Sequence, residues 1–172
     1  MDVSTARQLI ADAVNRRVTP SAVVEAGRAD GPIWREPFGR LTYDADAPPT
    51  GLDTIFDLAS LTKVMATTSL VMRAIREGRF PLDARVSDVL DGWATGERAE
   101  IRVRHLLEHS AGLPARLRLW ETCHGRADYE SALRAVTLER PPGAASVYSD
   151  LGFLVLGFIL ETTRGVPLPI SP

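Results

Sequence analysis

The spacing of apolar residues changes along the chain and predicts a helix followed by a β-hairpin in its first 57 residues. From Ser4 to Arg17 apolar residues recur at helical spacing, and Pro20 ends this pattern. Ser21 to Ala26 and Ile33 to Tyr43 are predicted strands, because turn-forming residues separate two runs of strand-forming composition. A loop that contains Pro and Gly is expected from Asp44 to Asp53.

Residues 58–172 are predicted to be mainly helical. Helical spacing begins after Ser60, and Gly78 is well placed to end this helix, which we expect to be buried. Shorter helices are expected before Trp93, before Gly112 and from Tyr129 to Thr137. A strongly apolar helix from Leu151 to Arg164, ended by Gly165, completes the pattern. The fold class is therefore α+β.

Composition predicts one soluble globular domain over residues 1–172. The chain is 45% apolar and carries a net charge of −2, which gives no bulk attraction to nucleic acid or to an anionic membrane. Its longest apolar stretch, Leu151 to Leu160, is about half of the roughly 20 residues that span a bilayer. We expect a small-molecule substrate, no nucleic-acid partner and no membrane contact. No phosphate-binding glycine loop appears, and no cofactor is expected.

The N-terminal segment and the single cysteine favour a cytoplasmic location. Met1 leads into a mixed segment without the apolar core of an export signal. Cys123 has no second cysteine with which to form an internal disulfide.

Lys63 is the most unusual basic residue, because the other nineteen of the twenty are arginine. An amine can lose its proton and act as a base in a protein, whereas a guanidinium cannot. Ser60 precedes it by three positions, so that on a helix the Lys63 amine can reach the Ser60 hydroxyl. The start of a helix also favours negative charge on a developing oxyanion. The alternative is that Ser60 only caps the helix and Lys63 is a solvated residue.

Tyr148 lies just before the last predicted helix and can present its hydroxyl to the same site. As a phenolate it could share the role of base, and as a phenol it could donate a proton. The alternative is a tyrosine packed in a loop.

Three segments occur in an order that resembles a known family. They are Ser60-Leu61-Thr62-Lys63 with the later Glu77–Asp83, the segment His105–Pro114, and Pro141-Pro142-Gly143 with Tyr148-Ser149-Asp150. From Asp53 to Gly165 the chain resembles the serine β-lactamases of class C and their penicillin-binding-protein and esterase relatives. This resemblance implies a β-lactamase/transpeptidase-like fold and a serine hydrolase that forms an acyl-enzyme. It implies Ser60 as the nucleophile, Lys63 as its base partner and Tyr148 as a proton relay.

The chain departs from the family pattern at Asp150 and at its C-terminus. Asp150 is expected to contact substrate, and it stands where the family commonly has Asn. An ionised carboxylate near Lys63 favours the ammonium form, which makes a β-lactam less expected than another ester or amide substrate. The family also continues past this length into further strands with a Lys-Thr-Gly or His-x-Gly motif. We therefore expect a truncated domain of doubtful activity that self-associates through unpaired sheet edges.

Two other functions stay open at this point. His105-Leu106-Leu107-Glu108-His109 fits a zinc peptidase pattern in which both imidazoles share a helix face, with Glu139 or Glu161 as a third ligand. The second alternative is a catalytically incomplete fragment that acts as an interaction module or is a remnant.

Overall fold

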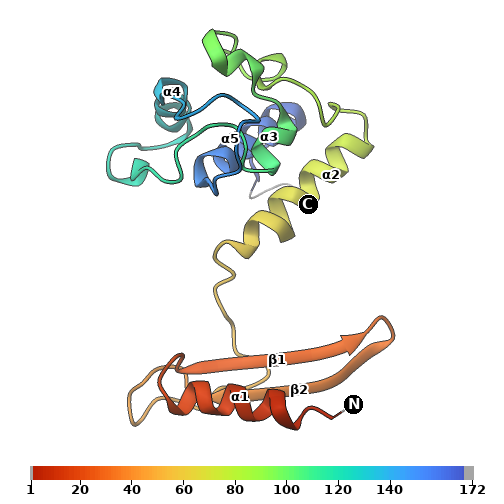
Figure 1. The fold of residues 1–172 in the computed structure, drawn as a ribbon, viewed down its shortest axis with the longest axis vertical. Helices are drawn as coiled ribbons and strands as arrows, with labels where there is room; N and C mark the ends of the chain where they lie inside the picture. The colour runs from red at the N-terminus through yellow and green to blue at the C-terminus, as the bar shows by residue number, and fades with distance from the viewer. Residues whose placement is uncertain (1, 169–172) are drawn as a thin grey trace. The chain divides into compact units, whose positions relative to one another are not determined.

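The computed structural model describes residues 2–168, and the chain divides after Asp57 into two compact units (Figure 1). The first unit contains a helix and a two-stranded sheet, and the second is mainly helical. The predicted α+β class is confirmed by this content. Each unit is described by itself.

The first unit packs helix α1 (Ser4–Asn15) along a hairpin of β1 (Ser21–Arg28) and β2 (Gly31–Gly39). The two strands are antiparallel, as predicted, and form a two-stranded sheet within the described residues. An ion pair of 2.7 Å between Arg7 Nε on α1 and Glu36 Oε2 on β2 joins the helix to the hairpin.

The second strand ends earlier than its composition predicted, at Gly39 and not at Tyr43. Gly39 has a φ of +76°, and a Cβ at this position would overlap with the carbonyl oxygen of Pro20. The backbone therefore leaves the strand at a glycine that permits a left-handed conformation and a close approach. This local requirement overrides the strand-like composition that follows.

The second unit is organised around helix α5 (Asp150–Arg164), whose apolar face is fully buried as predicted. Gly165, with a φ of +71°, ends α5, and Gly78, with a φ of +72°, ends α2, both as predicted. The other elements are η1 (Lys63–Thr68), α2 (Ser69–Arg76), η2 (Val86–Asp88), η3 (Gly96–Glu100), α3 (Val103–Leu107), η4 (Leu119–Glu121) and α4 (Arg126–Ala135). No helix in residues 2–168 is long and apolar enough to cross a membrane.

The prediction that Ser60 opens a buried helix is confirmed for the second half of that helix and wrong for its first turns. The helix begins directly after Ser60 and includes the π-helical segment η1, but Leu61, Val64 and Met65 are more than half exposed. Full burial begins only further along, at Val71 and Ala74 on α2. Helical spacing shows that a helix has an apolar face, but it does not show where along the helix that face is covered.

Candidate active site

The start of the second unit brings Ser60 and Lys63 together. Lys63 Nζ lies 3.3 Å from Ser60 Oγ, within hydrogen-bond distance. The backbone N–H of Lys63 also donates to the carbonyl of Ser60 at 3.0 Å, which closes a tight turn at the beginning of the helix. Ala59, directly before Ser60, has a φ of +44°, an unfavourable conformation for a residue with a Cβ. Such strain is common at functional sites.

The segment with Tyr148 is held in place by the loop that follows α3. Hydrogen bonds connect residues 146–150 to residues 108–115. Ser149 makes two of them, from its backbone N–H to His109 Nδ1 at 3.1 Å and from its hydroxyl to the carbonyl of Pro114 at 2.6 Å. These bonds fix the segment between the loop and the first turn of α5.

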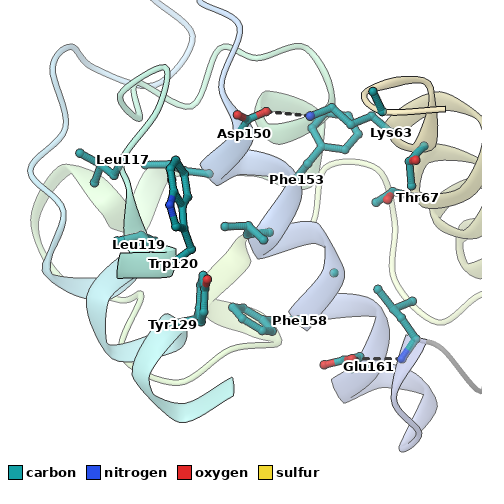
Figure 2. Close-up of a pocket in the computed structure, with 16 residues that line it drawn as sticks. Lys63, Thr67, Leu117, Leu119, Trp120, Tyr129, Asp150, Phe153, Phe158 and Glu161 are labelled. Carbon is teal, nitrogen blue, oxygen red and sulfur yellow. Dashed lines mark hydrogen bonds and ion pairs between the residues drawn. The ribbon is translucent and has the colours of Figure 1, made fainter. Parts of the chain in front are cut away.

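An ion pair connects Lys63, in the helix that follows Ser60, to Asp150, the first residue of α5. Lys63 Nζ lies 2.7 Å from Asp150 Oδ1 (Figure 2), and the Lys63 side chain is only 18% exposed. Nζ also lies 5.1 Å from the centre of the Tyr148 ring and 5.8 Å from that of Phe153. Arg116 Nε approaches the other carboxylate oxygen of Asp150 at 3.5 Å. All four predicted site residues, Ser60, Lys63, Tyr148 and Asp150, thus lie in one part of the second unit.

The contacts shift the pKa values of these groups in opposite directions. Burial lowers the pKa of Lys63, but hydrogen bonds to Asp150 and Tyr148 outweigh it, so the pKa is raised above its usual value. Hydrogen bonds with Ser60 and then Lys63 lower the pKa of Tyr148. The hydrogen bond from Lys63 is also the largest cause that lowers the pKa of Asp150. The resting site therefore favours an ammonium, a carboxylate and a more acidic phenol.

Two cavities flank Lys63, and both are bounded by Lys63 and Phe153. The first, of about 490 Å³, also has Asp150 in its wall. The second, of about 560 Å³, is lined by Ser60 and Tyr148. Lys63 therefore separates the side of the site that contains Asp150 from the side that contains Ser60 and Tyr148.

The prediction that His105 and His109 share a helix face, as a zinc site of this pattern requires, is wrong. Helix α3 ends at Leu107, and His109 leaves it with a φ of +57°, so His105 and His109 do not share a helix face. Nδ1 of His105 accepts the backbone N–H of Arg102 at 3.2 Å. Nδ1 of His109 accepts that of Ser149. Within residues 2–168 no group of three or more His, Cys, Asp or Glu side chains could hold a metal ion. Both histidines hold backbone segments in place.

Sequence reasoning missed the contacts that His109 and Arg116 make at this site. The His109 ring centre lies 4.6 Å from that of Tyr148. His109 and Arg116 are both far from Lys63 in the sequence. Spacing within one helix gives no signal of contacts between separate segments.

The β-lactamase family model matches residues 6–169. This chain belongs to the β-lactamase family. Among curated members, it is 32% identical over 128 residues to a protein of Escherichia coli (strain K12) named as a candidate D-alanyl-D-alanine carboxypeptidase. That alignment covers 67% of this chain but only 30% of the relative, so the chain spans less than a third of its length.

Solved structures of β-lactamase-family proteins share the fold. The octameric penicillin-binding-protein homologue of Pyrococcus abyssi superposes with a TM-score of 0.80 at 24% identity, covering 98% of this chain and 40% of that one. A class C β-lactamase gives a TM-score of 0.80 at 22% identity, covering 96% and 45%. The predicted β-lactamase/transpeptidase-like fold is confirmed, with the chain matching a part of each larger protein.

Proposed function

We propose that this β-lactamase-family chain carries the nucleophile of a serine hydrolase that forms an acyl-enzyme on Ser60. The observation that carries the proposal is the 3.3 Å contact between Lys63 Nζ and Ser60 Oγ at the beginning of a helix. The fall in the pKa of Tyr148, caused by hydrogen bonds with Ser60 and Lys63, supports it. These are the elements of an activated nucleophile with an adjacent base.

The proposed reaction proceeds in two steps. Ser60 Oγ attacks the substrate carbonyl carbon while its proton passes to Tyr148, whose phenolate form the Lys63 ammonium stabilises. The N–H groups at the helix start favour the oxyanion that forms. The tetrahedral intermediate then expels an alcohol or amine, to which Tyr148 returns the proton. Water attacks the acyl-enzyme by the same route and restores Ser60.

The ion pair with Asp150 gives Lys63 an electrostatic role in the resting enzyme. Because the pKa of Lys63 is raised, its ammonium holds the site ready for a negative charge, and Tyr148 is the better resting base. In this proposal the Lys63 ammonium keeps its proton throughout and stabilises the Tyr148 phenolate and the negative charge that develops on Ser60.

An ester or amide is the proposed substrate class. The name of the Escherichia coli relative refers to a peptidase, which supports an amide, and the class C neighbour supports a β-lactam as a second probe. A cytoplasmic location and self-association through the hairpin edges stay predictions.

Intact-mass spectrometry after exposure to a fluorophosphonate, and separately to a penicillin, tests the proposal. We expect a single adduct on Ser60 that is absent in Ser60→Ala. Lys63→Arg should label at least about 100-fold more slowly, because the planar guanidinium keeps the charge but cannot take the position of the compact ammonium beside Ser60 and Tyr148.

Ser69→Ala is the matched control, since Ser69 lies on the same continuous helix and its hydroxyl donates to the carbonyl of Val64. It should label like the parent chain. An adduct that persists in Ser60→Ala would contradict the assignment of the nucleophile. A folded chain that forms no adduct would favour the catalytically incomplete interaction module.

A further inference from the structure

Tyr148 accepts and returns the proton in the proposed reaction, yet it lies in a loop and is 52% exposed. Proton transfer requires its hydroxyl to lie within hydrogen-bond distance of Ser60 Oγ. A misplacement of about 1 Å can slow an enzymatic reaction about 100-fold. A half-exposed tyrosine in a loop therefore needs another residue to hold it in place.

His109 contacts the chain on both sides of Tyr148. Its carbonyl accepts the backbone N–H of Val147 at 2.8 Å, and its Nδ1 accepts that of Ser149 at 3.1 Å. The His109 ring centre lies 4.6 Å from that of Tyr148 and 5.1 Å from that of Phe153 on α5. One residue thus fixes the backbone before and after Tyr148 and also limits the movement of its ring.

The backbone conformation of His109 indicates that its side chain has a role. Directly after α3, His109 has a φ of +57°, in the left-handed region. A glycine adopts this region without steric cost, and Gly112 does so three residues later. A residue with a Cβ is strained there, and such strain persists mainly where the side chain is needed.

The hydrogen bond at Nδ1 requires a neutral imidazole. Nδ1 can accept the N–H of Ser149 only when it carries no proton, which places the ring proton on Nε2. Lys63 and Asp150 are the charged groups that act on the ring, and burial, followed by the charge of Lys63, lowers the pKa of His109. A neutral ring adds no second positive charge beside Lys63.

We propose that His109 is the positioning residue for Tyr148, and that its carbonyl, its Nδ1 and its ring together hold the phenol hydroxyl beside Ser60 and Lys63. The part that Tyr148 plays in the reaction rests on the proposed function, whereas its placement rests on these contacts alone. The pKa of Tyr148 reports the placement, because hydrogen bonds with Ser60 and then Lys63 lower it and are lost when the phenol moves away.

Two variants of His109 provide the first test. His109→Ala removes the ring and the Nδ1 acceptor, so fluorophosphonate labelling of Ser60 should slow about 100-fold and its pH midpoint should move to higher pH. His109→Asn should recover about tenfold of this loss, because the asparagine Oδ1 can accept the N–H of Ser149 and asparagine tolerates a left-handed backbone. If His109→Ala fails to fold, His109→Asn should still label more slowly than the parent chain, because the ring is missing. Labelling of either folded variant at the parent rate would overturn the proposal.

His105→Ala is the matched control. Nδ1 of His105 accepts the backbone N–H of Arg102 at 3.2 Å, a bond of the same kind that holds the start of α3 and not the Tyr148 segment. His105→Ala should leave the pH midpoint of labelling unchanged.

A double-variant cycle shows whether His109 acts through Tyr148. His109→Asn should slow labelling when Tyr148 is present but change it less than about twofold in the Tyr148→Phe chain, where no phenol hydroxyl remains to be positioned. An equal loss in both backgrounds would show that His109 only supports the fold, and would overturn the proposal.

NMR of chains with ¹³C-labelled tyrosine separates this proposal from the proposed function. The Tyr148 signal, identified by its loss in Tyr148→Phe, gives the pKa of Tyr148 without any reagent. A pKa that rises in His109→Asn, in a chain whose parent forms no adduct on Ser60, would support the positioning role and contradict the proposed function. A parent that forms the adduct, with the same Tyr148 pKa in the parent and both His109 variants, would overturn the positioning role and leave the nucleophile assignment standing.

Discussion

Asp150 is the residue that most changes the chemistry of this site. Its carboxylate lies between Lys63 at 2.7 Å and Arg116 at 3.5 Å. It raises the pKa of Lys63 through a hydrogen bond and through its charge, and its charge also opposes ionisation of Tyr148. Asp150 therefore stabilises the protonated forms of both groups that could accept the proton of Ser60.

Asp150→Asn should move the pH dependence of Ser60 labelling to lower pH by about one unit. Removing the carboxylate lowers the pKa of Lys63 and also that of Tyr148, so the basic form of either group becomes available at lower pH. The measurement is the rate of fluorophosphonate labelling between pH 5 and 10, with Asp91→Asn, outside the site, as the control. A midpoint that stays in place or rises would contradict this electrostatic role.

Spacing along the sequence predicted some contacts of this site and could not predict others. The contact between Ser60 and Lys63 follows from a separation of three residues at a helix start, and the residues alone predicted it. The approach of Tyr148 and Asp150 depends on α5 packing in the core. The residues alone suggested it only for Tyr148, with a packed loop tyrosine as the alternative, and the family resemblance favoured it. Arg116 was missed because an arginine in a loop carries no pattern that distinguishes it from the other eighteen.

At the scale of elements, the loop between α3 and η4 positions the Tyr148 segment. Gly112 in this loop has a φ of +78°, and its carbonyl accepts the N–H of Glu139 at 2.8 Å. A Cβ at Gly112 would overlap with the carbonyl oxygen of Arg140, a backbone atom that cannot rotate away. The loop therefore needs glycine for both conformation and space.

Gly112→Ala and Gly78→Ala separate these two requirements. Gly78 has a similar φ of +72°, but a Cβ there meets nothing within 4 Å. Gly78→Ala should lower the free energy of unfolding by about 1–2 kcal/mol through left-handed strain alone. Gly112→Ala should cost at least about 3 kcal/mol, because the overlap adds to the strain. Urea unfolding followed by circular dichroism measures both, and equal losses would show that the Gly112 loop adjusts freely.

Some predictions about the elements depend only on short-range sequence patterns, and others depend on contacts with distant segments. The hairpin, α5 and the glycines that end α2 and α5 were predicted, because each depends on short-range patterns. The predicted burial was wrong for the first turns of the helix after Ser60, since burial depends on which segment covers the apolar face. The shared helix face of His105 and His109 was also wrong, because the last turn of α3 unwinds two residues before His109.

At the scale of the whole molecule, the apolar core is distributed unequally between the two units. The cluster of buried apolar residues extends from Val71 to Leu160 and lies entirely in the second unit. Among residues 2–57 of the first unit, the buried ones are Ala47 and Thr50, neither of which is large. A helix on a two-stranded hairpin with so little buried apolar surface is marginal in stability.

We therefore expect residues 58–172 to fold as a separate chain and residues 1–57 not to do so. The longer fragment retains the whole core cluster and all four candidate site residues, and it should unfold cooperatively in urea. The shorter fragment should show a shallow, non-cooperative change in circular dichroism, because burial of a few small side chains does not offset the entropy of ordering its backbone. Cooperative unfolding of the 1–57 peptide at low concentration would contradict this view. It would mean that the hairpin and α1 gain their stability from contacts such as the Arg7–Glu36 ion pair and not from a buried core.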